Sequence, residues 1–292
     1  MTKLTKSMSL FIVLFVYAAA FTGGLLVYQM LPFHPVWKYL MADAAATIIV
    51  WLFGLIYKNA SMYDPYWSVA PLLLFICFIL EAQMLDAADI LYIAVFAFWG
   101  VRLTVNWILG WDHIKQQDWR YSMLKEQNKA LWPVTNFFGI NMMPTLIVFA
   151  NLLPAYFCTL SADSLTFVTA LGALVCVGAA ALQIVSDGQM RRFKSDPQNR
   201  GVNMEQGLWK YSRHPNYMGE VSFWWGVWIM QIGQIPGLWW TIFAPVFMTL
   251  LFVFISIPMM ERRLLETKEG YSAYRQNTSM LLLLPLKKRE SH

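Results

Sequence analysis

Polar and charged side chains crowd into residues 187–220, a stretch that lies between two long apolar segments. The types present can bind phosphates, sugar hydroxyls and amides, and the candidates for a cofactor site are Asp187, Arg191, Arg192, Tyr211, Arg213, His214, Asn216, Tyr217 and Glu220. Pro215 suits the first position of the following helix, where its missing N–H costs nothing. That helix N-terminus would present backbone N–H groups and a positive dipole end to an anion. In the alternative interpretation, the basic residues only mark the membrane edge and the acid is paired structurally.

Arg102 and Asn106 lie four residues apart on one face of another apolar segment, residues 89–110. A charged side chain at that depth costs roughly 3 kcal/mol or more, so we expect Arg102 to face a partner or a wet cavity. The alternative is that its long side chain extends up to the membrane interface.

Two acidic residues stand at segment ends. Asp64 precedes an apolar segment, and with Pro65 in the first helical turn it could be a purely structural N-cap. Asp187 closes a different segment, where a helix C-terminus disfavours an anion. A partner such as Arg191, or a ligand hydroxyl, is therefore expected there. A third acid, Asp43, is interpreted as structural.

The composition is that of an integral membrane protein. The chain has 292 residues, of which 58% are hydrophobic and only 13% charged, whereas a soluble domain is nearer one quarter charged. Its three cysteines lie in apolar runs without metal or pairing spacing, so no disulfide framework or zinc site is expected. The first apolar run is too long for a signal peptide and predicts a retained signal anchor.

A transmembrane helix needs about 20 mostly apolar residues. By that rule we expect an all-α polytopic fold, one transmembrane domain over residues 1–292, with these spans: 8–31, 40–58, 66–81, 89–110, 137–159, 163–187, 216–236 and 238–258. The last two are separated only by Pro236 and Gly237, so seven spans are also possible. With both termini cytoplasmic, every lysine and arginine except Lys38 and Arg102 lies on the cytoplasmic side.

The segments outside these spans are predicted from their composition. Residues 111–136 should contain a short interfacial helix, and the cytoplasmic tail, residues 259–292, should begin as a helix ended by Gly270. The net charge of +5 is explained by topology, and no nucleic-acid motif or glycine-rich phosphate loop is present. The polar residues gather at cytoplasmic helix ends, so we expect one site between the third, fourth, sixth and seventh spans, where a phosphorylated cofactor meets a lipidic substrate.

Residues 207–220, Gly-Leu-Trp-Lys-Tyr-Ser-Arg-His-Pro-Asn-Tyr-Met-Gly-Glu, resemble the signature of the bacterial DUF1295 family. That family is related to the C-terminal domain of steroid 5-alpha-reductases. The tail from Glu261, the Asp64-x-x-Trp67 pair and the run that starts at Arg102 also fit, so the resemblance covers roughly residues 60 to 285. Isoprenylcysteine-type membrane methyltransferases carry a similar Arg-His-Pro-x-Tyr motif and a similar tail.

The resemblance implies a membrane reductase that uses NADPH to saturate the C=C bond of an enone in a steroid-like or other lipophilic substrate. The catalytic residues it implies are Asp64 and Arg102. Tyr66, or alternatively Tyr63, would join them, because Trp99 stands where a proton-donating tyrosine is usual. Cofactor contacts are implied for Asp187 and Asn216, which match positions that contact the nicotinamide nucleotide, and by extension for Asn106 and Gln183. A bacterial inner membrane is the expected location.

Two other functions stay open. The first is methyl transfer from S-adenosylmethionine, in which the same rim would hold adenosine and a methionyl carboxylate. The Arg191 and Arg192 pair with Lys194 favours NADPH, since a 2′-phosphorylated dinucleotide needs more cations. The second is a non-catalytic membrane scaffold or lipid-binding protein, in which these polar residues pair among themselves.

Overall fold

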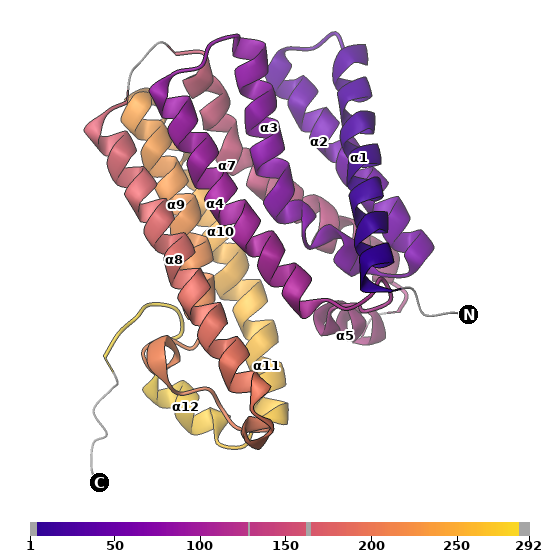
Figure 1. The fold of residues 1–292 in the computed structure, drawn as a ribbon, viewed down its shortest axis with the longest axis vertical. Coiled ribbons are helices and arrows are strands. Elements are labelled where there is room, and N and C mark those ends of the chain that lie inside the picture. The colour runs from indigo at the N-terminus through magenta and orange to yellow at the C-terminus, as the bar shows by residue number, and fades with distance from the viewer. Residues whose placement is uncertain (1–4, 128, 162–164, 286–292) are drawn as a thin grey trace. The chain divides into compact units, whose positions relative to one another are not determined.

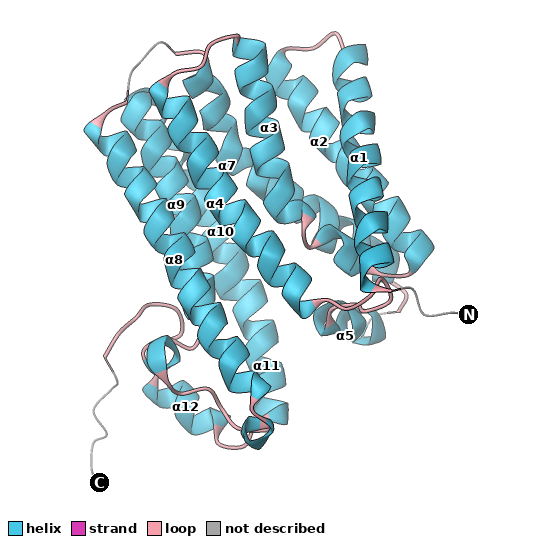
Figure 2. Cartoon of the chain, in the orientation of Figure 1, coloured by secondary structure: helices cyan, strands magenta, loops and turns pink. Residues whose placement is uncertain are grey.

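The computed structural model describes residues 5–127, 129–161 and 165–285, and within them the regular structure is helical, with no β-strand (Figure 2). Seven of the described helices are long and apolar enough to cross a membrane. They are Lys6–Met30, Pro35–Tyr57, Ala60–Ala82, Ala87–Gly110, Trp132–Thr159, Phe167–Ser195 and Pro236–Thr267. The predicted all-α polytopic fold is confirmed, and the chain is an integral membrane protein.

The predicted span 216–236 is a helix, α9 (Pro215–Gln234), but it is not one of the seven. It has 20 residues, yet Asn216, Glu220, Gln231 and Gln234 lower its hydropathy. Its separation from the next helix is confirmed, because α9 ends at Gln234 and a 3₁₀ turn begins at Pro236. By length and composition seven described helices qualify as spans, and α9 is a further helix of 20 residues with several polar side chains.

The chain divides into two compact units, residues 1–164 and 165–292. The single transmembrane domain expected over residues 1–292 stays a prediction. The first unit holds these helices: α1 (Lys6–Met30), α2 (Pro35–Tyr57), α3 (Tyr66–Ala82), α4 (Ala87–Gly110), α5 (Trp119–Gln127), α6 (Trp132–Val134) and α7 (Met143–Thr159). Figure 1 shows α1, α2 and α3 as neighbours in this unit. The short helix expected within residues 111–136 is confirmed as α5, and its place at the membrane interface stays a prediction.

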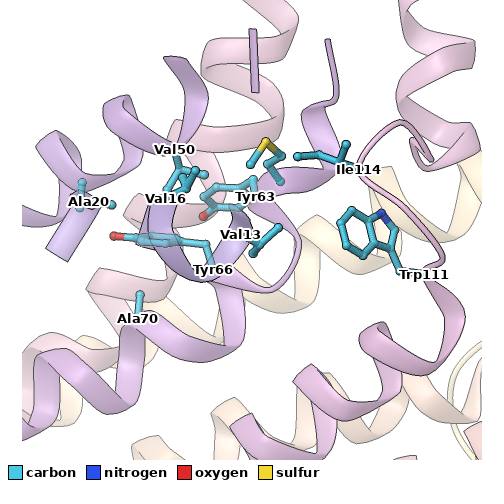
Figure 3. Close-up of a cluster of buried hydrophobic side chains, with 11 residues drawn as sticks. Val13, Val16, Ala20, Val50, Tyr63, Tyr66, Ala70, Trp111 and Ile114 are labelled. Carbon is cyan, nitrogen blue, oxygen red and sulfur yellow. The ribbon is translucent and has the colours of Figure 1, made fainter. Parts of the chain in front are cut away.

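A cluster of buried side chains joins the N-terminal half of α1 to the start of α3. Val13 and Val16 of α1 pack with Tyr63 and Tyr66, whose rings lie 5.5 Å apart (Figure 3). In the same figure the Tyr66 hydroxyl points away from Trp111. These contacts fix the chain segment that carries Asp64.

The second unit holds α8 (Phe167–Ser195), α9, α10 (Phe243–Leu251), α11 (Ile257–Thr267) and α12 (Tyr271–Asn277). Helices α8 and α9 pack closely because glycines face α8 at seven-residue intervals. A Cβ on Gly226 would lie 2.6 Å from the Cys176 sulfur, and one on Gly219 would lie 2.8 Å from the Ala179 carbonyl oxygen. Small residues that let helix backbones approach are typical of such membrane pairs.

One helix boundary differs from the prediction in a way that matters for the site. Helix α8 continues past Asp187 to Ser195, so Asp187 lies two turns inside the helix, and the argument from a helix C-terminus was wrong. The run from Gln189 to Lys194 has good helix formers, and the helix ends only before Pro197. At the tail, α11 ends at Thr267, and Gly270 takes the positive φ of 72° in the turn to α12, close to the predicted end.

Candidate functional site

A buried acid, Glu261 of α11, contacts two arginines and a histidine of the second unit. Its Oε1 atom accepts from Arg213 Nε at 2.6 Å and lies 3.2 Å from His214 Nε2, and its Oε2 atom accepts from Arg275 Nε at 2.9 Å. Arg213 also donates from Nη1 to the carbonyl oxygens of Arg275 and Thr278. These contacts tie the start of α9 to the tail, which gives Arg213 and His214 a structural role. Their assignment to cofactor phosphates stays a prediction.

His214 is 3% exposed, and its ring stacks on that of Tyr217 with centroids 5.4 Å apart. Burial is the main cause that lowers the pKa of His214 from its usual value, while the hydrogen bond to Glu261 opposes it. Neutral imidazole is therefore the form that the fold favours. The predicted neighbour Tyr211 lies at the surface, 43% exposed, with Lys210 Nζ above its ring.

The lowered pKa of His214 predicts a pH-dependent stability. In the unfolded chain the His214 imidazole binds a proton near pH 6.5, and in the folded chain it does so only at lower pH. The stabilisation of the fold that comes from neutral His214 is therefore complete above about pH 6.5 and is lost on acidification. We expect the melting temperature in detergent to fall between pH 7.5 and 5.5, and the fall to be smaller in His214→Gln. The matched control is His113→Gln in the loop after α4. An identical fall in His214→Gln would contradict the assignment.

A second polar group joins the middle of α8 to the start of α9. Asn216 Nδ2 donates to Asp187 Oδ1 at 3.2 Å, and both side chains are partly exposed. One turn deeper, Gln183 Nε2 donates to Glu220 Oε2 at 2.7 Å, and Trp224 Nε1 donates to the other oxygen at 3.2 Å. Glu220 is thus held inside the helix pair, whereas the Asp187–Asn216 pair is accessible to a ligand.

A basic cluster lies at the end of α8. The positive charges of Arg263 in α11 and Lys268 just after it repel the charge of Lys194, whereas the negative charge of Asp187 attracts it. Lys194 is exposed, and Lys268 also donates to the Val202 carbonyl oxygen at 2.9 Å. The two arginines predicted beside it, Arg191 and Arg192, are exposed on the same helix end. Like charges brought together in this way favour an anionic ligand.

In the first unit, Asp64 does not cap α3. Pro65 precedes that helix without a side-chain cap, so the interpretation of Asp64 as its N-cap was wrong. The Asp64 carboxylate instead accepts a 2.6 Å hydrogen bond from the Tyr121 hydroxyl of α5, and both side chains are partly exposed. Burial, and then the negative charge of Asp64, raise the pKa of Tyr121 well above its usual value. The Tyr121 hydroxyl therefore stays protonated at neutral pH and can donate.

The other residues of this unit that were predicted for the site have surroundings of their own, apart from the Asp64–Tyr121 hydrogen bond. The Tyr66 hydroxyl donates to Asp43 Oδ1 at 2.6 Å, inside an apolar cavity lined by α1, α2 and α3. Arg102 and Asn106 lie one turn apart on α4, both partly buried, and Trp99 is fully buried one turn before Arg102. That these residues share one site with the second unit stays a prediction.

Sequence reasoning missed four residues that the structure brings into these groups: Tyr121, Glu261, Arg263 and Lys268. The sequence position of Glu261 could have indicated its role, because a carboxylate at the end of an apolar span needs hydrogen-bond donors. Tyr121 had no such indication beyond its place in a polar, aromatic loop. Arg263 of α11 and Lys268 just after its end resembled ordinary membrane-edge charges.

The fold defines an all-helical integral membrane protein. A family model described as "Protein of unknown function (DUF1295)" matches residues 50–278, and the chain belongs to this family. A curated relative from Schizosaccharomyces pombe, "Uncharacterized protein C594.04c", is 25% identical over 228 residues, which cover 67% of this chain and 64% of the relative. The chain thus matches less than two thirds of that relative's length. No solved structure matches it.

Proposed function

We propose that this protein is a membrane-embedded reductase that uses NADPH to saturate the C=C bond of an enone in a lipophilic substrate. The observation that carries the proposal is the 3.2 Å hydrogen bond between Asn216 and Asp187, with the exposed Lys194 two turns further along α8 and Arg263 and Lys268 as further cations of the same unit. Asp187 and Lys194 are seven residues apart on α8, so they share one face about 10 Å apart. Phosphate binding at one end and ribose or carboxamide binding at the other would suit a dinucleotide.

The donor set fits the two chemical parts of such a cofactor. A carboxylate and an amide, as in Asp187 and Asn216, bind hydroxyls and carboxamides. Three cations would bind the phosphates, including a 2′-phosphate, through charge-assisted hydrogen bonds. S-adenosylmethionine carries no phosphate, so a cluster of like charges favours NADPH over methyl transfer. When bound, NADPH supplies a hydride, and the protein's part is to orient it and stabilise charge.

For the substrate side we propose that Asp64 and Tyr121 polarise the enone carbonyl. The Tyr121 hydroxyl would donate to the carbonyl oxygen, where negative charge develops as the β-carbon receives hydride. Asp64 would hold the hydroxyl through its 2.6 Å hydrogen bond. Tyr121 would thereby supply the phenol that Trp99 lacks. It takes this role in place of Tyr66, because the Tyr66 hydroxyl is hydrogen-bonded to Asp43. Arg102 and Asn106 would complete the polar lining. Residues 207–220 resemble the DUF1295 signature, and the relation of that family to steroid 5-alpha-reductases favours the same reaction class.

We also infer that the basic cluster faces the cytoplasm, where NADPH is available, and that the membrane is a bacterial inner membrane. The placement of nearly all lysines and arginines on one side of the predicted spans supports the orientation. The family resemblance supports the membrane.

Selectivity between NADPH and NADH tests the cofactor assignment. Lys194→Ala, Arg263→Ala and Lys268→Ala should each weaken NADPH binding about 10-fold, because a charge-assisted hydrogen bond contributes roughly 1.5–3 kcal/mol. NADH binding should change less, because it lacks the 2′-phosphate. Affinities are measured by fluorescence titration of the purified protein.

Lys210→Ala is the control for that titration, since Lys210 is an exposed cation of the same unit that lies over Tyr211. It should leave both affinities unchanged. Equal losses for NADPH and NADH in the cluster variants, or no loss for either, would contradict the proposed phosphate site.

A further inference from the structure

The first unit contains a cavity of about 400 Å³, a size suited to one lipid-like small molecule. Its walls come from one face each of α1, α2 and α3, which lie side by side in Figure 1. On α3 the lining runs from Tyr66 to Glu81, which corresponds to about 22 Å along the helix. Small side chains, Ala42, Ala46 and Ala70, leave the space between these walls. The cavity is therefore elongated and largely apolar.

The polar groups of this cavity carry one sign of charge. Two carboxylates, Asp43 and Glu81, and four tyrosines line it, and among the described lining residues there is no lysine, arginine or histidine. Glu81 lies at one end, where it accepts from the Tyr28 hydroxyl at 2.8 Å and where Lys38 Nζ lies 4.0 Å from the Tyr28 ring centroid. A cation is thus already present near Glu81.

Asp43 has a different environment. It is 3% exposed, and the hydroxyl of Tyr66, itself 8% exposed, donates to its Oδ1 atom at 2.6 Å. A buried carboxylate is costly unless it is hydrogen-bonded and paired with a positive charge. The rings of Tyr17 and Phe21 border the same space, and aromatic faces attract cations. A ligand that brings a positive charge to Asp43 would complete this environment.

We propose that the cavity binds a lipophilic amine, with its ammonium group at Asp43 and its hydrocarbon part along the apolar face of α3. The ammonium would donate to the Asp43 carboxylate and lie against the tyrosine rings, while the hydrocarbon chain would lie along α3 from Val69 to Cys77. Charge complementarity favours this occupant over a neutral lipid. The α1 wall and Asp43 lie outside residues 50–278, the part that the family model matches, and neither Asp64 nor Tyr121 lines the cavity, so the site is additional to the proposed reductase site.

Three ligands of equal chain length test the proposal on the full-length protein in one detergent: dodecylamine, dodecanol and dodecanoic acid. Binding is measured by native mass spectrometry and by the shift in melting temperature. The amine should bind at least about 10-fold more tightly than the alcohol, since one charge-assisted contact contributes roughly 1.5 kcal/mol or more. The acid should bind weakest, because it would place a second negative charge beside Asp43.

Asp43→Asn should abolish the preference for the amine and leave dodecanol binding within about twofold, whereas Asp112→Asn, an exposed acid outside the cavity, should keep the preference. The ligand series on the unmodified protein remains decisive if Asp43→Asn does not fold. Equal affinity for dodecanol and dodecylamine, or tighter binding of the acid, would overturn the proposal and identify a site for neutral or acidic lipids.

Discussion

Replacing Glu261 by glutamine is expected to cost about 3–5 kcal/mol of stability and to lower the melting temperature by roughly 10 °C. The reason is that Arg213 is 8% exposed and would lose its carboxylate partner, while Arg275 would lose its own contact to the same acid. A buried charge left without a counter-ion is more costly than the loss of the pair itself. Thermal unfolding in detergent, followed by tryptophan fluorescence, measures the effect.

Glu266→Gln is the matched control, because Glu266 is on the same helix and exposed. It should change the melting temperature little. Hydrogen exchange adds a local measurement: in Glu261→Gln the amides of α12 should exchange faster, since Arg213 binds the carbonyls of Arg275 and Thr278. An unchanged melting temperature together with unchanged exchange in α12 would show that Glu261 is not the anchor of the tail.

Tyr121→Phe and Asp64→Asn are each expected to reduce turnover of an enone lipid about 100-fold or more, with little change in NADPH affinity. The phenylalanine removes the proposed hydrogen-bond donor, and the asparagine removes the carboxylate that orients it, so each loss is of the size that a positioned donor contributes. Because the two groups act as a unit, the double variant should be scarcely slower than either single one. NADPH oxidation at 340 nm with a panel of enone lipids measures the rate.

Tyr57→Phe and Asp112→Asn serve as controls in the same unit and should retain full turnover. A purely structural role for the pair would lower the melting temperature and NADPH affinity along with turnover. That result would remove Asp64 and Tyr121 from the proposed reaction and return Tyr66 as the candidate donor.

The membrane fold could be predicted because apolar length and the charge pattern depend on local sequence alone. The α8–α9 pairing is different: its glycines are visible in the sequence, but the approach of Gly226 to Cys176 depends on how the two helices pack. The length of α9 also predicted a transmembrane span, but its polar side chains lower its hydropathy below that of the other long helices.

The candidate site could be predicted as a set of residues but not as a set of contacts. Arg213 and His214 fitted an anion site by type, yet Glu261 reaches them from 48 and 47 residues away in the sequence. Asp64 fitted a helix cap by position, and its partner Tyr121 comes from α5, 57 residues later. In both cases the missing information was which distant segment returns to the same place.

The central claim, that NADPH is the cofactor, is tested most directly by mass spectrometry of the small molecules released from the detergent-purified protein, followed by titration with NADPH and S-adenosylmethionine. The account predicts that NADP(H) is released, or that NADPH alone binds tightly. Release of S-adenosylmethionine or its demethylated product would contradict it in favour of methyl transfer, and absence of binding to either would favour a scaffold or lipid-binding protein.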